Sequence, residues 1–379
     1  MSETTADRQF LGRGDVNDVE SILADDAIDF GAVAHATAAR GDAIFTWDYD
    51  RTRKGLGKLY EKAKTSQWNG STDLDWSTPV DPEKVALEMA PAAAAIQQRM
   101  ADIPDSPVKG WGPKEWTTFQ VEALNWRMSQ FLHGEQGALI CTAKIVSTTP
   151  WVDAKYYAAT QVVDEARHVE VFARYLDTKL EGHYPVNPAL QLLIDDIIGD
   201  SRWDMTYMGM QIMVEGLALA AFGFMHSVTE EPLLKKLLRY VMSDEARHVA
   251  FGVLSLQEYY EGLDATELRE RQEFAFEAAI RMRDRLMMHS VWEKMGVDRK
   301  TVTEFLLGIR QMGNNPFQAA LFSKIVPNCK KLGLLDAGDA WLRDRFTDIG
   351  VIQFEDAADT GEDYGAYDEV AKDRVTASA

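Results

Sequence analysis

From about residue 113 onward, apolar residues recur every three to four positions, which is the period of an amphipathic α-helix. Proline and glycine interrupt this pattern, because neither continues a helix well. We expect long helices over 113–149, 151–180 and 231–261, and another that opens at Asn187-Pro188 and kinks near 199–201. Shorter helices are expected over 51–64, 82–100, 265–294, 299–311, 316–332 and 337–347. No strand pattern of any length is present, so the sequence predicts an all-α fold.

This order of elements predicts four regions. They are an accessory region over 1–112, a four-helix bundle over 113–262, accessory helices over 263–350 and an acidic disordered tail over 351–379. The first region contains a loop rich in turn-forming residues, 66–76, with Trp68 and Trp76. The interpretation that we favour is that both rings anchor the loop on the bundle. The alternative is that a tryptophan belongs to an electron or radical path.

One six-residue motif, Asp-Glu-Ala-Arg-His-Val, occurs at 164–169 and again at 244–249. Glu and His are three residues apart in each copy, so on a helix they share one face with Cβ atoms roughly 5–6 Å apart. A lone glutamate inside an apolar stripe lies thirty residues before each copied glutamate, Glu135 in the first case and Glu215 in the second. One metal ion can bind both side chains of such a Glu-x-x-His pair.

A helix break lies midway along each of these thirty-residue spans. Pro150 marks the first break, and Glu230, two residues before Pro232, marks the second. If each break is a tight turn, a rise of about 1.5 Å per residue places both carboxylates at one level, roughly 22 Å from the turn. Two such hairpins supply the ligand set of a ferritin-like di-iron or di-manganese bundle. The predicted metal ligands are Glu135, Glu165, His168, Glu215, Glu245 and His248.

The chemistry of this ligand set indicates the metal. Four carboxylates buried in an apolar core are too costly without compensating charge, and two divalent ions cancel their charge. Oxygen-rich ligation with two imidazoles and no thiolate suits iron or manganese and argues against structural zinc. The two cysteines, Cys141 and Cys329, form no Cys-x-x-Cys motif, so the sequence suggests neither a disulfide framework nor a zinc site.

Over residues 114–262 the sequence resembles the superfamily of di-iron oxidases and oxygenases, because of the two motifs and their equally spaced partner glutamates. This superfamily includes bacterial multicomponent monooxygenases, ribonucleotide reductase small subunits, ribonucleotide-reductase-like ligand-binding oxidases and acyl-carrier-protein desaturases. The resemblance implies a site with two iron ions, or one manganese and one iron, that reacts with O2. It also implies an external electron donor, a reductase or a ferredoxin, and is compatible with a homodimer.

Particular residues separate the members of this superfamily. Phe172 stands where ribonucleotide reductase small subunits usually carry a radical tyrosine, so a tyrosyl-radical reductase is not favoured. Leu219 replaces a threonine of the multicomponent monooxygenases, although the doubled motif is most similar to theirs. Val241 replaces the additional histidine ligand of arylamine N-oxygenases. Acyl-carrier-protein desaturases agree in length and ligand order, but space the first glutamate pair more widely.

The two motif aspartates, Asp164 and Asp244, directly precede ligand glutamates. In the families that the sequence resembles, the aspartate of one motif pairs with the histidine of the other, which implies Asp244 with His168 and Asp164 with His248. We favour this arrangement because metal-bound histidines usually donate their second N–H group to an acceptor. Pairs of Asp with the Arg three residues later are an alternative that is compatible with it.

Composition narrows the class of partner. The chain of 379 residues has 60 acidic and 40 basic residues, and its net charge of −20 opposes binding to nucleic acid or anionic membranes. The charge is most simply a solubility feature, and the alternative is an acidic docking face for a basic redox partner. No uninterrupted run of 18 apolar residues and no basic-then-apolar start is present, so we expect no membrane span and a cytoplasmic location.

Helix phase predicts an apolar substrate pocket lined by Ala138, Phe172, Ala218, Leu219 and Phe222. The sequence therefore favours an O2-activating oxygenase or oxidase that acts on a small apolar or acyl substrate. A desaturase and a ligand-binding oxidase with an Fe/Fe or Mn/Fe site are the alternatives. Iron storage and a purely structural bundle are disfavoured, because neither explains four glutamates and two histidines buried in a chain of this length.

Overall fold

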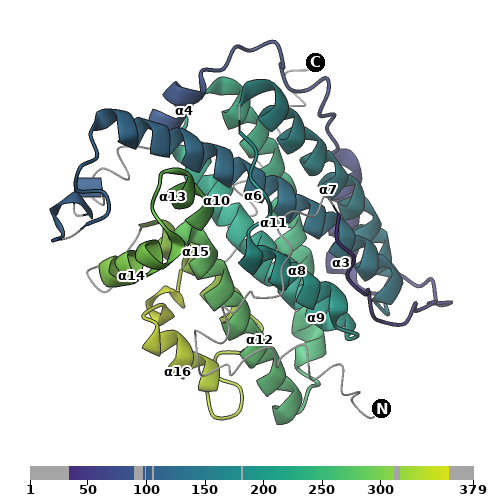
Figure 1. Ribbon diagram of the computed structural model, residues 1–379. Helices are drawn as coiled ribbons and strands as arrows, with labels where there is room; N and C mark the ends of the chain where they lie inside the picture. Colours follow the sequence, from purple (N-terminus) through teal and green to yellow (C-terminus); the bar gives the residue numbers. More distant parts are fainter. Residues whose placement is uncertain are drawn as a thin grey trace.

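The structure, a computed structural model, describes residues 34–88, 97–98, 100–104, 106–180, 182–310 and 316–357. All regular structure within these ranges is helical, which confirms the predicted all-α fold (Figure 1). The predicted four regions cannot all be followed, because most of the tail, 358–379, lies outside the described residues. Its described beginning contains a short 3₁₀ turn, η3 (Ile352–Phe354), after the buried Val351.

Four long helical segments form the bundle. The first, second and fourth segments are single helices, α6 (Pro113–Thr148), α7 (Val152–Lys179) and α11 (Pro232–Tyr260). The third segment consists of four consecutive elements, α8 (Pro188–Gly199), α9 (Trp203–Tyr207), η1 (Met208–Val214) and α10 (Glu215–Val228). Proline stands in the first turn of α6, α8 and α11, where a missing N–H group costs nothing. The side chains of Asn187 and Glu231 accept hydrogen bonds from the first N–H groups of α8 and α11.

The predicted kink at 199–201 is confirmed as the break between α8 and α9. The π-helical segment η1 directly before Glu215 was not predicted. Such segments often mark functional sites, because they insert one residue and turn the following side chains. Here η1 ends at Val214, one residue before Glu215, which the motif spacing selects as a metal ligand.

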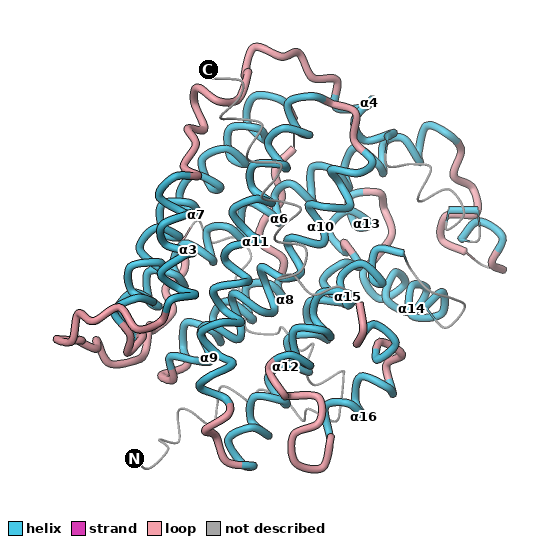
Figure 2. Tube along the Cα trace, turned by 180° about the vertical axis from the view of Figure 1, so that it is seen from behind, coloured by secondary structure: helices cyan, strands magenta, loops and turns pink. Residues whose placement is uncertain are grey.

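The helices pack as two hairpins with accessory helices around them. α6 packs along α7, and α10 packs along α11. α3 (Lys54–Thr65) covers α7 and α11 on one side of the bundle, while α12 (Ala265–Asp284) packs against α8 and η1, and α15 (Pro316–Lys331) against α10, on the other. Figure 2, seen from behind, shows the same two sides.

Several accessory helices differ from the predicted ranges. The single helix expected over 265–294 is wrong, because α12 ends at Asp284 and is followed by the 3₁₀ turn η2 (Arg285–Met287) and by α13 (His289–Lys294). Met288, between them, has a φ of 52°. The described residues also contain α4 (Pro82–Glu88), α14 (Arg299–Arg310) and α16 (Trp341–Asp348). Part of the helix predicted over 82–100 lies outside the described residues.

The apolar core of the bundle is divided along the helices. On α6, Leu124 and Phe131 belong to one buried cluster, whereas Ala138 and Ile145 belong to another. The change from one cluster to the other occurs around Glu135, and on α7 it occurs across the first motif. Buried polar residues therefore occupy a layer between two apolar clusters, at one level of the bundle.

Among the described residues, Trp203–Val228 is the one helical stretch long and apolar enough to cross a bilayer by length and composition. In its most apolar 18-residue window, 78% of the residues are buried inside the structure. A helix at the centre of a bundle has the same composition, because it is covered on all sides by other helices. The apolar character of this stretch is therefore weak evidence for a membrane span.

Candidate dimetal centre

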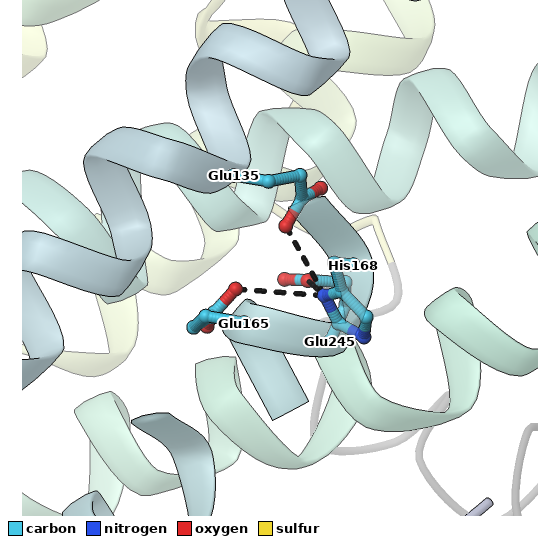
Figure 3. Close-up of side chains that lie close together, drawn as sticks. All are labelled: Glu135, Glu165, His168 and Glu245. Atoms are coloured by element: carbon cyan, nitrogen blue, oxygen red, sulfur yellow. Dashed lines mark hydrogen bonds and ion pairs between the residues drawn. The ribbon is translucent and has the colours of Figure 1, made fainter. Parts of the chain in front are cut away.

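The four long segments bring the six predicted ligands into one buried cluster. None of these residues is more than 4% exposed: Glu135, Glu165, His168, Glu215, Glu245 and His248. They form two groups that share Glu165. The first group also contains Glu135, His168 and Glu245, and the second also contains Glu215 and His248. Within each group the candidate ligand atoms lie within 4.8 Å of one another. Figure 3 shows the first group, with its side chains pointing toward a common centre.

Glu165 and Glu245 lie between the two imidazoles. Nδ1 of His168 is 3.5 Å from a Glu165 oxygen and 3.2 Å from a Glu245 oxygen. Nδ1 of His248 is 3.1 Å from Glu165 and 3.6 Å from Glu245. Glu135 lies only on the His168 side, where its Oε2 is 3.1 Å from Nδ1. Two metal ions held here would share Glu165 and Glu245, and each would have one further carboxylate and one imidazole.

The residues present fit two metal ions. Several of the inward-facing atoms are buried and have no hydrogen-bond partner among the described residues, namely Oε2 of Glu165, Oε2 of Glu215, both carboxylate oxygens of Glu245 and Nδ1 of His248. Buried polar atoms that make no hydrogen bond are rare in folded proteins, and an ion would supply the missing partner. Carboxylate and imidazole ligands suit iron and manganese. That these atoms ligate metal stays a prediction.

The charges of the cluster are unbalanced without a metal. Burial, with help from the charge of Glu245, raises the pKa of Glu135 to about 8. Burial and the charge of Glu165 likewise raise the pKa of Glu215. Burial opposes the charged form of His168, but Glu135 and Asp244 outweigh it and raise the pKa of this imidazole. Divalent ions binding here would replace protons, because metal ligands must be deprotonated.

The aspartates hold the outer nitrogens of the two histidines, in the crossed arrangement that the sequence predicted. Nε2 of His168 lies 3.2 Å from Asp244, and Nε2 of His248 lies 3.4 Å from Asp164. The pairs within each motif are also present, since Arg167 donates to Asp164 and Arg247 donates to Asp244. A hydrogen bond from Nε2 to an aspartate would leave Nδ1 of each imidazole free to bind a metal ion in place of a proton.

The tryptophan loop reaches this network. Trp68 is 5% exposed, and its indole N–H donates to Asp244 across 2.7 Å. The neighbouring Gln67 donates to Asp164 across 2.9 Å. The indole N–H of Trp76 instead donates to the carbonyl of Gly70, within the loop itself. The guanidinium of Arg174 on α7 lies over the Trp76 ring, 4.4 Å from its centroid, so both rings contact the bundle, as the favoured interpretation expected.

Sequence reasoning missed Gln161, one turn before Glu165 on α7. Its amide nitrogen donates to Glu165 across 2.9 Å and to Glu215 across 2.8 Å. The side chain is fully buried. Its hydrogen bonds link Glu165, which belongs to both groups, to Glu215 of the second group. The sequence could have indicated Gln161 by its position four residues before the predicted ligand Glu165, on the same helix face.

Replacing this amide tests its role in orienting the carboxylates. We expect Gln161→Leu to weaken metal binding by about 10- to 100-fold, because residues that orient metal ligands contribute on that scale. Competition with a metallochromic chelator measures the change. Thr160→Val, at the half-buried neighbouring position, should leave the affinity unchanged. Equal affinity of Gln161→Leu and the unmodified protein would show that the amide does not support the site.

A narrow cavity opens beside the cluster. Its volume is about 20 Å³, room for roughly one water molecule. Its walls include three carboxylates of the cluster together with apolar residues and one arginine: Gln130, Phe131, Gly134, Glu135, Ala138, Val214, Glu215, Ala218, Phe222, Glu245 and Arg285. The predicted lining residues Ala138, Ala218 and Phe222 are therefore among the walls.

The cavity walls do not include the other two predicted lining residues. Phe172 is fully buried and packs behind the wall, with ring centroids 5.9 Å from Phe131 and 5.6 Å from Phe222. Leu219 is also fully buried, in the apolar cluster that contains these rings. Helix phase selects the face toward the metals but does not say on which side of that face the space lies, so the place of these two residues in a substrate pocket stays a prediction.

Some solved structures have a fold similar to that of this chain. The structure of a variant of R2-like ligand-binding oxidase with an anaerobically reconstituted Mn/Fe cofactor is similar with a TM-score of 0.50 and 18% identity, over 75% of this chain and 94% of that chain. A second variant with the same cofactor has a TM-score of 0.48 and 17% identity, over 77% and 96% of the two chains. The first similarity shows that the chain has the ferritin-like fold of the dimetal carboxylate proteins. No protein-family model and no curated protein matches the sequence.

Proposed function

We propose that this protein is an O2-activating non-haem di-iron oxygenase or oxidase that acts on a small apolar or acyl substrate. The observation that carries the proposal is the pair of carboxylates, Glu165 and Glu245, between two imidazoles in a buried layer of a ferritin-like bundle. These residues would hold two iron ions, which would supply the electrons for the reduction of O2. An external reductase or ferredoxin restores those electrons.

The chain itself contributes orientation, charge balance and exclusion of water. Asp164 and Asp244 hold the imidazoles so that both Nδ1 atoms face inward. Four glutamates offer four negative charges, which match two divalent ions. Apolar walls from Phe131, Ala138 and Phe222 leave little room for water beside the ligands, and a dry site protects reactive species from side reactions.

Two related activities use the same site. An acyl-chain desaturase removes hydrogen from its substrate and places no oxygen in it. A ligand-binding oxidase would use an Fe/Fe or Mn/Fe pair, and the similar solved structures named above carry Mn/Fe. The identity of the metals and the fate of oxygen therefore separate the candidates.

Metal analysis and oxygen labelling test the proposal. We expect about two iron ions per chain after aerobic expression with iron. Chemical reduction followed by addition of O2 should produce near-ultraviolet absorption. Incorporation of label from ¹⁸O2 into product, read by mass spectrometry, indicates an oxygenase, whereas unsaturated, unlabelled product indicates a desaturase. One manganese and one iron per chain would favour the ligand-binding oxidase. A folded protein that binds no metal would refute all three activities.

A further inference from the structure

Three neighbouring aromatic side chains are largely exposed to solvent, and we call them the aromatic ridge. They are Phe45, Trp47 and Tyr49, which are 74%, 76% and 62% exposed, more than any other large apolar residue in the described part of the chain. The rings of Phe45 and Trp47 stack, with centroids 5.5 Å apart. Their segment is the dark purple stretch outside α3 and α7 in Figure 1. An exposed apolar patch of a few hundred Å² usually marks an interaction site.

The backbone of this segment presents the rings on one face. Ile44 and Thr46 alternate with the rings and are half-buried. They hold the segment on the end of the α6–α7 hairpin, because the N–H group of Ile44 donates to the carbonyl of Ser147 and the hydroxyl of Thr46 donates to the carbonyl of Pro150. Such alternation is the period of a β-strand. Over residues 45–49 the backbone makes no hydrogen bond to another described segment, so one strand edge is open.

The charge beside the ridge is negative. Asp42, Asp48 and Asp50 are exposed, and within the described ranges none of them forms an ion pair. The two arginines that follow, Arg51 and Arg53, are already paired with carboxylates of α7 and α11 at 2.9 Å. Aromatic ring faces also attract lysine and arginine. A cationic partner therefore gains contacts with both the aspartates and the rings.

We propose that the aromatic ridge binds an extended segment of another protein in which lysine or arginine alternates with apolar residues. The segment adds a strand to the open edge at 45–49, so that main-chain hydrogen bonds supply affinity and side chains supply selectivity. Its apolar side chains cover the rings, and its basic side chains, on the alternate face, meet Asp48 and Asp50. Because Phe45 and Trp47 already stack on each other, little ordering is needed on binding.

Charge disfavours two other occupants of the ridge. A second copy of the chain carries the same net charge of −20 and would bring equal aspartates together. Residues 1–33, which lie outside the described residues, contain eight acidic and two basic residues, so their charge also opposes binding beside the aspartates. A basic segment of another protein is the occupant that the surface fits.

Synthetic peptides test this surface on the full chain. Fluorescence polarisation in about 150 mM salt compares three labelled peptides, Lys-Val-Lys-Leu-Lys-Val-Lys, its glutamate counterpart Glu-Val-Glu-Leu-Glu-Val-Glu, and Lys-Pro-Lys-Leu-Lys-Pro-Lys. The prolines of the third peptide keep the charge but remove strand hydrogen bonds. We expect the first peptide to bind, and the other two to bind at least about 10-fold more weakly.

Replacing the rings tests their part in binding. A chain with both Phe45→Ala and Trp47→Ala should bind the first peptide about 10- to 100-fold more weakly, because aromatic residues at the centre of an interface carry much of its binding energy. Leu307→Ala, at an exposed apolar position of α14, is the matched control and should bind the peptide normally.

Replacing the aspartates tests the charge. Asp48→Asn together with Asp50→Asn should weaken binding of the first peptide about 3- to 10-fold and make it less sensitive to salt. Glu304→Gln removes an exposed carboxylate from α14 and should leave both the affinity and its salt dependence unchanged.

Thermal unfolding and sedimentation separate the proposed partner from the other two occupants. The doubly substituted chain, Phe45→Ala with Trp47→Ala, should keep the midpoint of the unmodified protein, because exposed side chains contribute little to stability. A clear decrease would show that another part of the chain covers the rings, and would overturn the proposal. Both proteins should also have the same oligomeric state. An oligomer that dissociates on this double substitution would assign the ridge to a second copy and overturn the proposal as well.

The peptide results decide among the remaining explanations. Equal binding of the two lysine peptides would contradict strand addition. Equal binding of the glutamate peptide would indicate an unselective apolar patch, and lysine-peptide binding that survives the loss of both rings would indicate attraction by charge alone. Each of these results refutes the proposal, as does the absence of any binding.

Discussion

Replacing Glu165 with alanine should remove metal from both positions of the site, whereas Glu135→Ala should remove it from only one. The difference follows from the positions of the two carboxylates. Glu165 contacts Nδ1 of both imidazoles, and Glu135 contacts only that of His168. We therefore expect about two metal ions per chain in the unmodified protein, about one in Glu135→Ala and fewer than one in Glu165→Ala.

Elemental analysis after gel filtration measures these numbers, and circular dichroism verifies that each variant is folded. Glu170→Ala is the matched control, because Glu170 is an exposed glutamate on the same helix. It should keep both metals. Glu165→Gln guards against loss of the fold, since the amide retains the shape of the side chain but binds divalent ions poorly. It should be folded and poor in metal.

Retention of two metals by a folded Glu165→Gln variant would contradict the ligand assignment. Equal metal loss in Glu135→Ala and Glu165→Ala would contradict the narrower statement that Glu165 bridges. In that case the two positions would be filled only together, as a single unit. The comparison of terminal and bridging glutamates is thus more informative than either variant alone.

The spacing of the ligands was readable from the sequence because helices are regular. Two copies of one motif, each with a glutamate thirty residues upstream, place six side chains at one level of a bundle once the breaks near Pro150 and Pro232 are recognised. The structure brings all six together. The crossed pairs of Asp164 and Asp244 with the histidines followed from the resemblance, and the hydrogen bonds confirm them.

Other residues of the site depend on tertiary packing, which periodicity does not encode. Trp68 reaches Asp244 from a loop outside the bundle, 176 positions earlier in the chain. Arg285 enters the cavity because a helix ends one residue before it, where the sequence pattern predicted a continuous helix. The π-helical segment before Glu215 shifts the phase of α10, and no residue type in it signals that shift.

Replacing Asp244 with alanine should lower the free energy of unfolding of the chelator-treated protein by about 3–5 kcal/mol, the usual cost of leaving buried charges without a partner. Asp244 is 1% exposed and accepts hydrogen bonds from Trp68, Arg167 and Arg247, besides its contact with His168. Its removal takes one carboxylate partner from each of two buried arginines and leaves both dependent on Asp164. Chemical denaturation monitored by circular dichroism measures the loss.

The matched control lies on the same helix. Glu258 on α11 pairs with Arg53 across 2.9 Å, but its side chain is 64% exposed, so Glu258→Ala should change stability little. Asp244→Asn keeps the shape and part of the hydrogen bonding, and its loss should be smaller than that of Asp244→Ala. A loss below about 1 kcal/mol in Asp244→Ala would show that the remaining Asp164 supports both arginines alone.

The pH dependence of stability separates the effect of the Asp244 charge from the effect of its side-chain shape. Burial favours the neutral form, but the charges of Arg247, His168 and Arg167 outweigh it and hold the pKa of Asp244 well below its ordinary value. A carboxyl group with a lowered pKa in the folded state contributes stability above its unfolded pKa, near 4, and loses that contribution as the pH falls toward the folded value. The difference in stability between the unmodified protein and Asp244→Asn should therefore be full at pH 7 and shrink below about pH 4. A difference that stays constant down to pH 3 would mean that Asp244 acts through its shape and not through its charge.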